Sequence, residues 1–70
     1  MRQTGVVKCF AAGWGFITDS NHRDIFVHWS AIQASGFKQL FPGDVCAFEV
    51  EQNERGVHAI RVQKIGEAPL

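Results

Sequence analysis

The sequence has few cysteines, no excess charge of either sign and no long apolar run. Two cysteines in 70 residues can form at most one disulfide bond. This excludes a disulfide scaffold and favours a reducing compartment, with Cys9 and Cys46 as small core residues. No apolar stretch approaches the length needed to span a bilayer, and no signal-peptide pattern is present. We therefore expect a cytoplasmic protein with no membrane partner.

Charge is balanced, because seven Lys and Arg residues face seven Asp and Glu residues. This speaks against a protein that binds duplex nucleic acid mainly through a large positive field. It does not exclude a small local basic patch. The chain of 7.8 kDa is 46% hydrophobic and shows no repeat, low-complexity segment or linker. We expect one folded domain over residues 1–70, with its ordered core at about 5–64.

The apolar residues are β-formers with short-range spacing, interrupted by turn signals. They predict five short strands, at about 5–11, 14–19, 24–29, 45–51 and 57–64. Residues 30–33 are expected to form one 3₁₀ turn capped by Ser30. Five strands without a long helix predict an all-β sandwich or barrel. A barrel is favoured, because closure removes the exposed edges of so small a sheet.

Alternation along the strands divides the side chains into two faces. The aliphatic face is the natural interior, with Ile17, Ile25, Val27, Ile60 and Val62. That choice turns the aromatic rings of the second and third strands outward together with an imidazole. Lys8 and Phe10 of the first strand are expected on the same outer face. The outward set of the second and third strands is Trp14, Phe16, Phe26 and His28.

Exposed aromatic rings on a small domain suit base stacking, where one base on one ring contributes roughly 1–3 kcal/mol. His28 can stack and donate a hydrogen bond, while Lys8 and Arg55 are placed to meet phosphates. Gly13 and Gly15 would leave the surface open between the rings. Two other readings stay open at this point: the rings fill the core, or they form a patch for another protein.

Two motifs carry a family resemblance. Residues 13–17 (GWGFI) and 25–29 (IFVHW) resemble the two ribonucleoprotein motifs of bacterial cold-shock proteins. The resemblance implies a five-stranded antiparallel Greek-key barrel of the OB type. It also implies binding of single-stranded RNA or DNA with low sequence specificity and a pyrimidine preference, in an ATP-independent RNA chaperone or transcription antiterminator. The positions that match the family's binding surface are Lys8, Phe10, Trp14, Phe16, Asp24, Phe26, His28, Trp29, Phe37, Arg55 and His58.

The sequence departs from the family pattern at two places. Cys9 stands where a surface Trp is usual, and only Ala11 and Ala12 separate Phe10 from Gly13, where the family has four residues including a Lys. The missing Trp and Lys predict weaker binding than in a typical member. Ala-Ala also lacks the Asn or Gly that a tight turn prefers. The alternatives for oligomeric state are therefore a monomer and a strand-swapped homodimer.

Other chemistry finds little support in the sequence. His22, His28, His58, Cys9 and Cys46 lack the ligand spacing of a zinc site, so we expect no metal. No phosphate-binding loop and no nucleophile–base arrangement is recognisable, so we expect neither a cofactor nor an enzyme. The main alternative function is a protein-interaction module that uses the same aromatic face.

Overall fold

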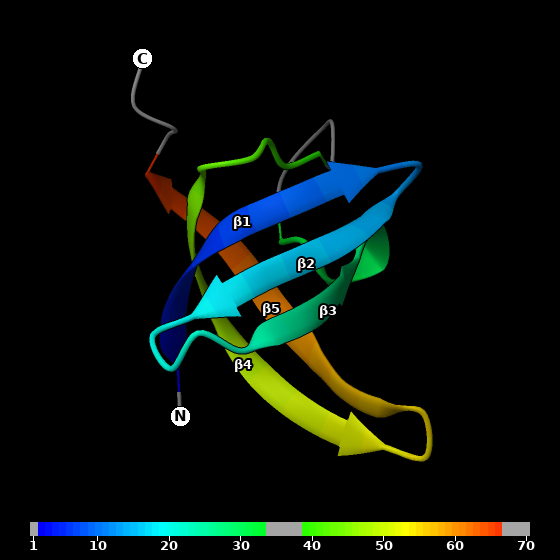
Figure 1. Cartoon of the computed structure of the whole chain (residues 1–70). Coiled ribbons are helices and arrows are strands. Elements are labelled where there is room, and N and C mark those ends of the chain that lie inside the picture. The colour runs from blue at the N-terminus through cyan, green and yellow to red at the C-terminus, as the bar shows by residue number, and fades with distance from the viewer. Residues whose placement is uncertain (1, 34–38, 67–70) are drawn as a thin grey trace.

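The computed structural model describes residues 2–33 and 39–66, which form a closed five-stranded β-barrel (Figure 1). No helix in these ranges is long and apolar enough to cross a membrane. Neighbouring strands follow the order β1-β2-β3-β5-β4 around the barrel. The expected all-β five-stranded barrel is confirmed. The elements are β1 (Gln3–Ala11), β2 (Trp14–Asp19), β3 (Asp24–His28), η1 (Trp29–Ala31), β4 (Val45–Asn53) and β5 (Gly56–Gly66).

Strand pairing is antiparallel except at one seam, where β3 and β5 run parallel and pair through Phe26 and His58. Beyond that seam the β4–β5 hairpin extends past the sheet of β1, β2 and β3 (Figure 1). Because β3 and β5 pair through a single residue pair, the contact that closes the barrel is short. This geometry brings the outer side of β3 next to the outer side of β5.

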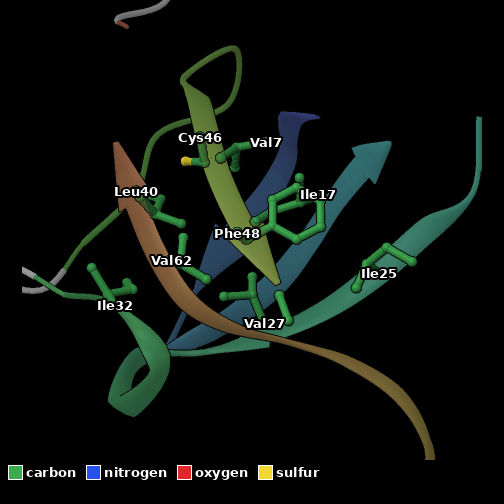
Figure 2. Close-up of a cluster of buried hydrophobic side chains, with 10 residues drawn as sticks. Val7, Ile17, Ile25, Val27, Ile32, Leu40, Cys46, Phe48 and Val62 are labelled. Carbon is green, nitrogen blue, oxygen red and sulfur yellow. The ribbon is translucent and has the colours of Figure 1, made fainter. Parts of the chain in front are cut away.

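The core is filled by aliphatic side chains around one aromatic ring, the fully buried Phe48 of β4 (Figure 2). Burial of such side chains contributes about 1.5–3 kcal/mol each. In β2 and β3 the predicted alternation is confirmed, because Ile17, Ile25 and Val27 all point inward. The buried hydrophobic residues are Val7, Ile17, Ile25, Val27, Ile32, Leu40, Cys46, Phe48, Ala59 and Val62.

Strict alternation fails in β5, and the expected core position of Ile60 is wrong. Between the pairs Glu49–Ile60 and Ala47–Gln63, β5 holds one residue more than β4. Arg61 occupies this bulge with φ 50°, in the left-handed region. As a result Ala59 and Val62, three positions apart, both face the core, while Ile60 is only half-buried.

A second bulge in β1 moves Cys9 and Phe10 away from their predicted faces. Val7 pairs with Ile17 and Cys9 with Phe16, so β1 has one extra residue at Lys8. Beyond the bulge Cys9 is exposed, which corrects its expected place in the core. Phe10 is half-buried and packs against the core instead of lying fully on the outer face. The second cysteine, Cys46, is buried as expected.

The connection between β1 and β2 is a two-residue turn of Ala12 and Gly13, closed by the pair of Ala11 and Trp14. It lies one residue later than the Ala-Ala connection expected from the sequence. Both turn residues have positive φ, 57° for Ala12 and 89° for Gly13. Gly13 adopts this conformation freely, whereas an alanine in the left-handed region costs about 1–2 kcal/mol.

Gly15 faces inward, so the interpretation that it keeps the aromatic surface open is wrong. A Cβ atom built on Gly15 would collide with the backbone oxygen of Cys9 and would lie 2.7 Å from the Cα of Phe10. The missing side chain therefore lets β1 approach β2 closely beyond the bulge.

Candidate nucleic-acid interface

One outer side of the barrel carries five rings, which we call the aromatic face: Trp14, Phe16, Phe26, His28 and Trp29. Antiparallel pairing of β2 and β3 places Phe16 opposite Phe26 and Trp14 opposite His28. Trp29 follows at once in η1. Trp14 is 48% exposed, Phe26 36% and Trp29 47%. The core-filling reading of these rings is thereby excluded for the three, because each presents a third or more of its surface to solvent.

Two of the three contacts among Trp14, Phe16 and Phe26 are edge contacts. Phe16 meets Trp14 at 83° and Phe26 at 73°, with centroids 6.2 and 6.0 Å apart. Trp14 and Phe26 are tilted by 31° at 6.0 Å. Edge contacts of this kind are favourable for an aromatic pair, and in each of them the edge of one ring meets one face of the other. The arrangement provides several flat platforms that are fixed in position before any ligand arrives.

His28 links the aromatic face to η1. Its Nδ1 accepts a hydrogen bond from the backbone N–H of Ser30 at 3.3 Å and lies 2.8 Å from the Ser30 hydroxyl. His28 therefore caps η1, which begins at Trp29 and not at the predicted residue 30 with Ser30 as its cap. The His28 and Trp29 rings lie 5.4 Å apart. A Cβ atom on Gly13 would lie 2.9 Å from Trp29 Cδ1. The absence of a side chain at Gly13 therefore leaves room for the indole ring.

A polar contact across three strands lies beyond the phenylalanines. Lys8 Nζ of β1 donates to Asp24 Oδ2 of β3 at 2.9 Å, and the Thr18 hydroxyl of β2 donates to Asp24 Oδ1 at 3.1 Å. The hydrogen bond and charge of Asp24 raise the pKa of Lys8, and the hydrogen bonds from Lys8 and Thr18 lower the pKa of Asp24. Lys8 is thus charged and available, but it already has an acidic partner.

A groove opens along the β3–β5 seam, and we call it the seam groove. It consists of two adjoining hollows of about 590 and 360 Å³. Phe26, His28, Ser30 and His58 line both hollows, so the groove begins at the aromatic face. Sequence reasoning missed the groove, because it depends on β3 and β5 meeting at a single residue pair. The remaining lining residues are Ala31, Gln33, Asn53, Arg55, Gly56, Val57, Ala59, Ile60 and Arg61.

The structure brings most, but not all, of the predicted site residues together. Arg55 and His58 lie across the seam groove from His28, and Arg55 makes no ion pair with any of the described residues. Phe37 lies outside the described residues. Within the described ranges, no three His, Cys, Asp or Glu side chains gather closely enough to hold a metal ion.

Comparison with known proteins agrees with this geometry. Residues 3–65 match the family model described as the 'Cold-shock' DNA-binding domain. The chain is 52% identical over 64 residues to cold shock protein CspC of Bacillus subtilis, covering 89% of this chain and 97% of the relative. It is 49% identical over 63 residues to the major cold shock protein of Streptococcus pyogenes serotype M6, covering 87% and 94%.

A comparison of structures shows the same fold. All of this chain superposes on 29% of a longer solved chain described as drosophila Unr CSD456, with a TM-score of 0.79 at 21% sequence identity. The barrel is therefore the five-stranded OB type that cold-shock domains share.

Proposed function

The chain belongs to the cold-shock domain family, a non-enzymatic family of nucleic-acid-binding domains, and from that premise we propose that it binds single-stranded RNA or DNA by stacking unpaired bases on the aromatic face. The observation that carries the proposal is the contiguous exposure of Trp14, Phe26 and Trp29 on one side of a small barrel. Every base has a flat π-surface, so such platforms accept many sequences. The proposal includes the expected preference for pyrimidines.

The platforms discriminate between open and paired strands. A duplex hides its base faces in its own stack, so only unpaired bases can lie on Trp14 or Phe26. A protein that binds only the open form of an RNA hairpin shifts the folding equilibrium by mass action. At a free protein concentration of about 100 times Kd this shift is worth roughly 2.7 kcal/mol. This is ATP-independent chaperone or antiterminator activity.

Charged groups are expected to assist the rings without dominating the affinity. Lys8 must share its ammonium between Asp24 and a phosphate, whereas Arg55 has no acidic partner among the described residues. With two or three phosphate contacts, the slope of log affinity against log salt is about −1.4 to −2.1 for a single strand. A much steeper slope would mean that charge, not stacking, contributes most of the binding free energy.

Quenching of tryptophan fluorescence tests the proposal directly, because both tryptophans of the chain, Trp14 and Trp29, lie on the aromatic face. Short oligopyrimidines with ribose and with deoxyribose are titrated, beside an oligopurine and a duplex of the same length. We expect saturable quenching by both single strands, weaker binding of the oligopurine and little response to the duplex. Absence of quenching by any single strand at tens of micromolar would refute base stacking. A protein-interaction module would then be the better reading of the same face.

A further inference from the structure

Gly13, the second residue of the β1–β2 turn, lies against Trp29 in two ways. Its carbonyl oxygen accepts the backbone N–H of Trp29 at 2.8 Å. The three atoms nearest to a Cβ atom built on Gly13 all belong to the five-membered ring of the Trp29 indole, at 2.9, 3.7 and 3.7 Å. The turn therefore meets both the backbone and the ring of the residue that begins η1.

The backbone conformation of Gly13 is only half of the reason for a glycine at this position. Gly13 has φ 89° and Gly56 has φ 121°. Nothing lies within 4 Å of a Cβ atom built on Gly56, so there the conformation alone requires glycine. At Gly13 a side chain would be strained and would also overlap the indole. The turn backbone is closed by the pair of Ala11 and Trp14, so the ring is the part that would have to move.

Trp29 stands where the core gives its ring little support. The three residues of η1 include none that is buried, and Trp29 is 47% exposed. The neighbouring His28 ring lies 5.4 Å away and caps η1 by accepting the Ser30 N–H. An exposed indole has several staggered side-chain conformations available, and each of them directs the π-surface differently. A fixed neighbour such as the turn selects one of them.

We propose that Gly13 is a positioning residue, whose bare Cα holds the Trp29 ring in the orientation that receives a base. The inference rests on the function proposed above, because Trp29 is one of its platforms, and it adds what fixes that platform. Gly13 acts on binding only through Trp29. A ring that is already oriented loses less conformational freedom when a base stacks on it, so positioning increases affinity without any new contact to the strand.

The position of the turn links this contact to the strain at Ala12. Because the turn lies one residue later than Ala-Ala, Gly13 takes its second position, where positive φ and the nearby indole both require glycine. Ala12 then takes the first position, at φ 57°. The contact with Trp29 and the strain of the alanine therefore come from one turn, but they reside in different residues. Substitutions at Ala12 and at Gly13 can separate them.

The first test follows the accessibility of Trp29 without nucleic acid. Trp14→Phe leaves Trp29 as the only tryptophan of the chain. In this background Gly13→Ala should increase the quenching of Trp29 fluorescence by acrylamide, because the added Cβ atom pushes the ring off the turn. Ala12→Asn is the matched control, since Asn tolerates positive φ and Gly13 stays in place. Its quenching should equal that of the background protein. Unchanged quenching in Gly13→Ala, or an equal rise in Ala12→Asn, would overturn the inference.

The second test is a double-mutant cycle on the Kd of an oligothymidine, measured by tryptophan quenching. Gly13→Ala should raise Kd at least about fivefold, the lower bound for the loss of one stacked base. In a Trp29→Ala background, where Trp14 remains as the reporter, the same change should raise Kd less than about twofold, because the two residues act as one unit. An equal rise in both backgrounds would show that Gly13 supports the barrel in general, and it would overturn the inference.

A second substitution separates the overlap with the indole from backbone strain. Gly13→Asn also adds a Cβ atom, but Asn tolerates positive φ, so it should reproduce both effects of Gly13→Ala with less strain. Normal quenching and affinity in folded Gly13→Asn would contradict the positioning role. Thermal unfolding shows which variants are folded during the measurements. Absence of binding by the unsubstituted protein would instead refute the proposed function, while the acrylamide measurement would still decide whether Gly13 positions Trp29.

Discussion

Replacement of Phe26 by alanine removes the central platform of the aromatic face. The Phe26 ring lies 6.0 Å from both Trp14 and Phe16, and it also lines the seam groove. Because the side chain points outward and is 36% exposed, its loss leaves the core residues in place. Phe26→Ala therefore tests recognition more than folding.

The expected loss follows from the value of one stacked base. Truncation of a stacking ring costs about 1–3 kcal/mol per base, which corresponds to roughly a five- to 150-fold rise in Kd. Trp14 loses a tilted ring contact and Phe16 an edge contact, each worth about 0.5–1.5 kcal/mol, so their rings are held less firmly. Lys8→Ala should raise Kd less than about threefold, because the ammonium already has Asp24 as a partner. Its salt slope should become shallower by about 0.7.

The assay is tryptophan quenching by an oligopyrimidine at one pH and several salt concentrations. Phe41→Ala is the matched control, because Phe41 is 55% exposed but belongs to neither the aromatic face nor the seam groove. It should bind like the unsubstituted protein. Thermal unfolding verifies that each variant is folded during the titration. The stacking account is wrong if Phe41→Ala weakens binding as much as Phe26→Ala, or if Lys8→Ala weakens it more.

Three further predictions concern stability and reactivity. Ala12→Asn should raise the free energy of unfolding in urea by about 1 kcal/mol, because Asn tolerates the left-handed region. The same substitution should also reduce the fraction of any dimer that light scattering detects. An unchanged free energy of unfolding would show that the turn is unstrained. In the native protein only the exposed thiol of Cys9 should react rapidly with a disulfide reagent, because burial raises the pKa of Cys46 to about 11. In denaturant both thiols should react. Two rapidly reacting thiols in the native protein would contradict this prediction. Stability should fall below about pH 4, because hydrogen bonds from the Arg23 and Asn21 backbones and from the Arg23 side chain lower the pKa of Asp19 from 3.8. The stability it contributes is present above the unfolded pKa and is lost as pH falls through the folded value, so Asp19→Asn should make the acid limb shallower.

Sequence periodicity was sufficient where the strands are regular. In β2 and β3, which pair without a bulge, alternation correctly separates buried Ile17 and Val27 from exposed Trp14 and Phe26. The turn signals likewise place all five strands within a few residues of their bounds. Four of the five rings of the aromatic face therefore follow from the sequence, because they stand on these two strands, whereas Trp29 begins η1.

The alternation of inward and outward side chains fails in the strands that contain bulges. The bulges at Lys8 and Arg61 each shift the faces that follow, which exposes Cys9 and withdraws Ile60 from the core. No glycine marks either position, and Arg61 adopts positive φ despite its side chain. One signal was present in the sequence. A glycine inside a strand often marks a close backbone approach, and Gly15 accommodates the β1 backbone beyond the first bulge.

The charge balance has a structural form that bears on function. Four of the described cations lie within 3.6 Å of a carboxylate oxygen, so their fields are largely cancelled at long range: Lys8, Arg23, Arg61 and Lys64. A strong positive field would attract duplex and single strand alike, because both carry phosphates. With that field suppressed, the proposed function makes discrimination depend on Trp14 and Phe26, on which only bases that are already unpaired can stack. The proposed function therefore predicts that cations added around the aromatic face increase the affinity for both paired and unpaired strands and reduce the preference for the unpaired ones.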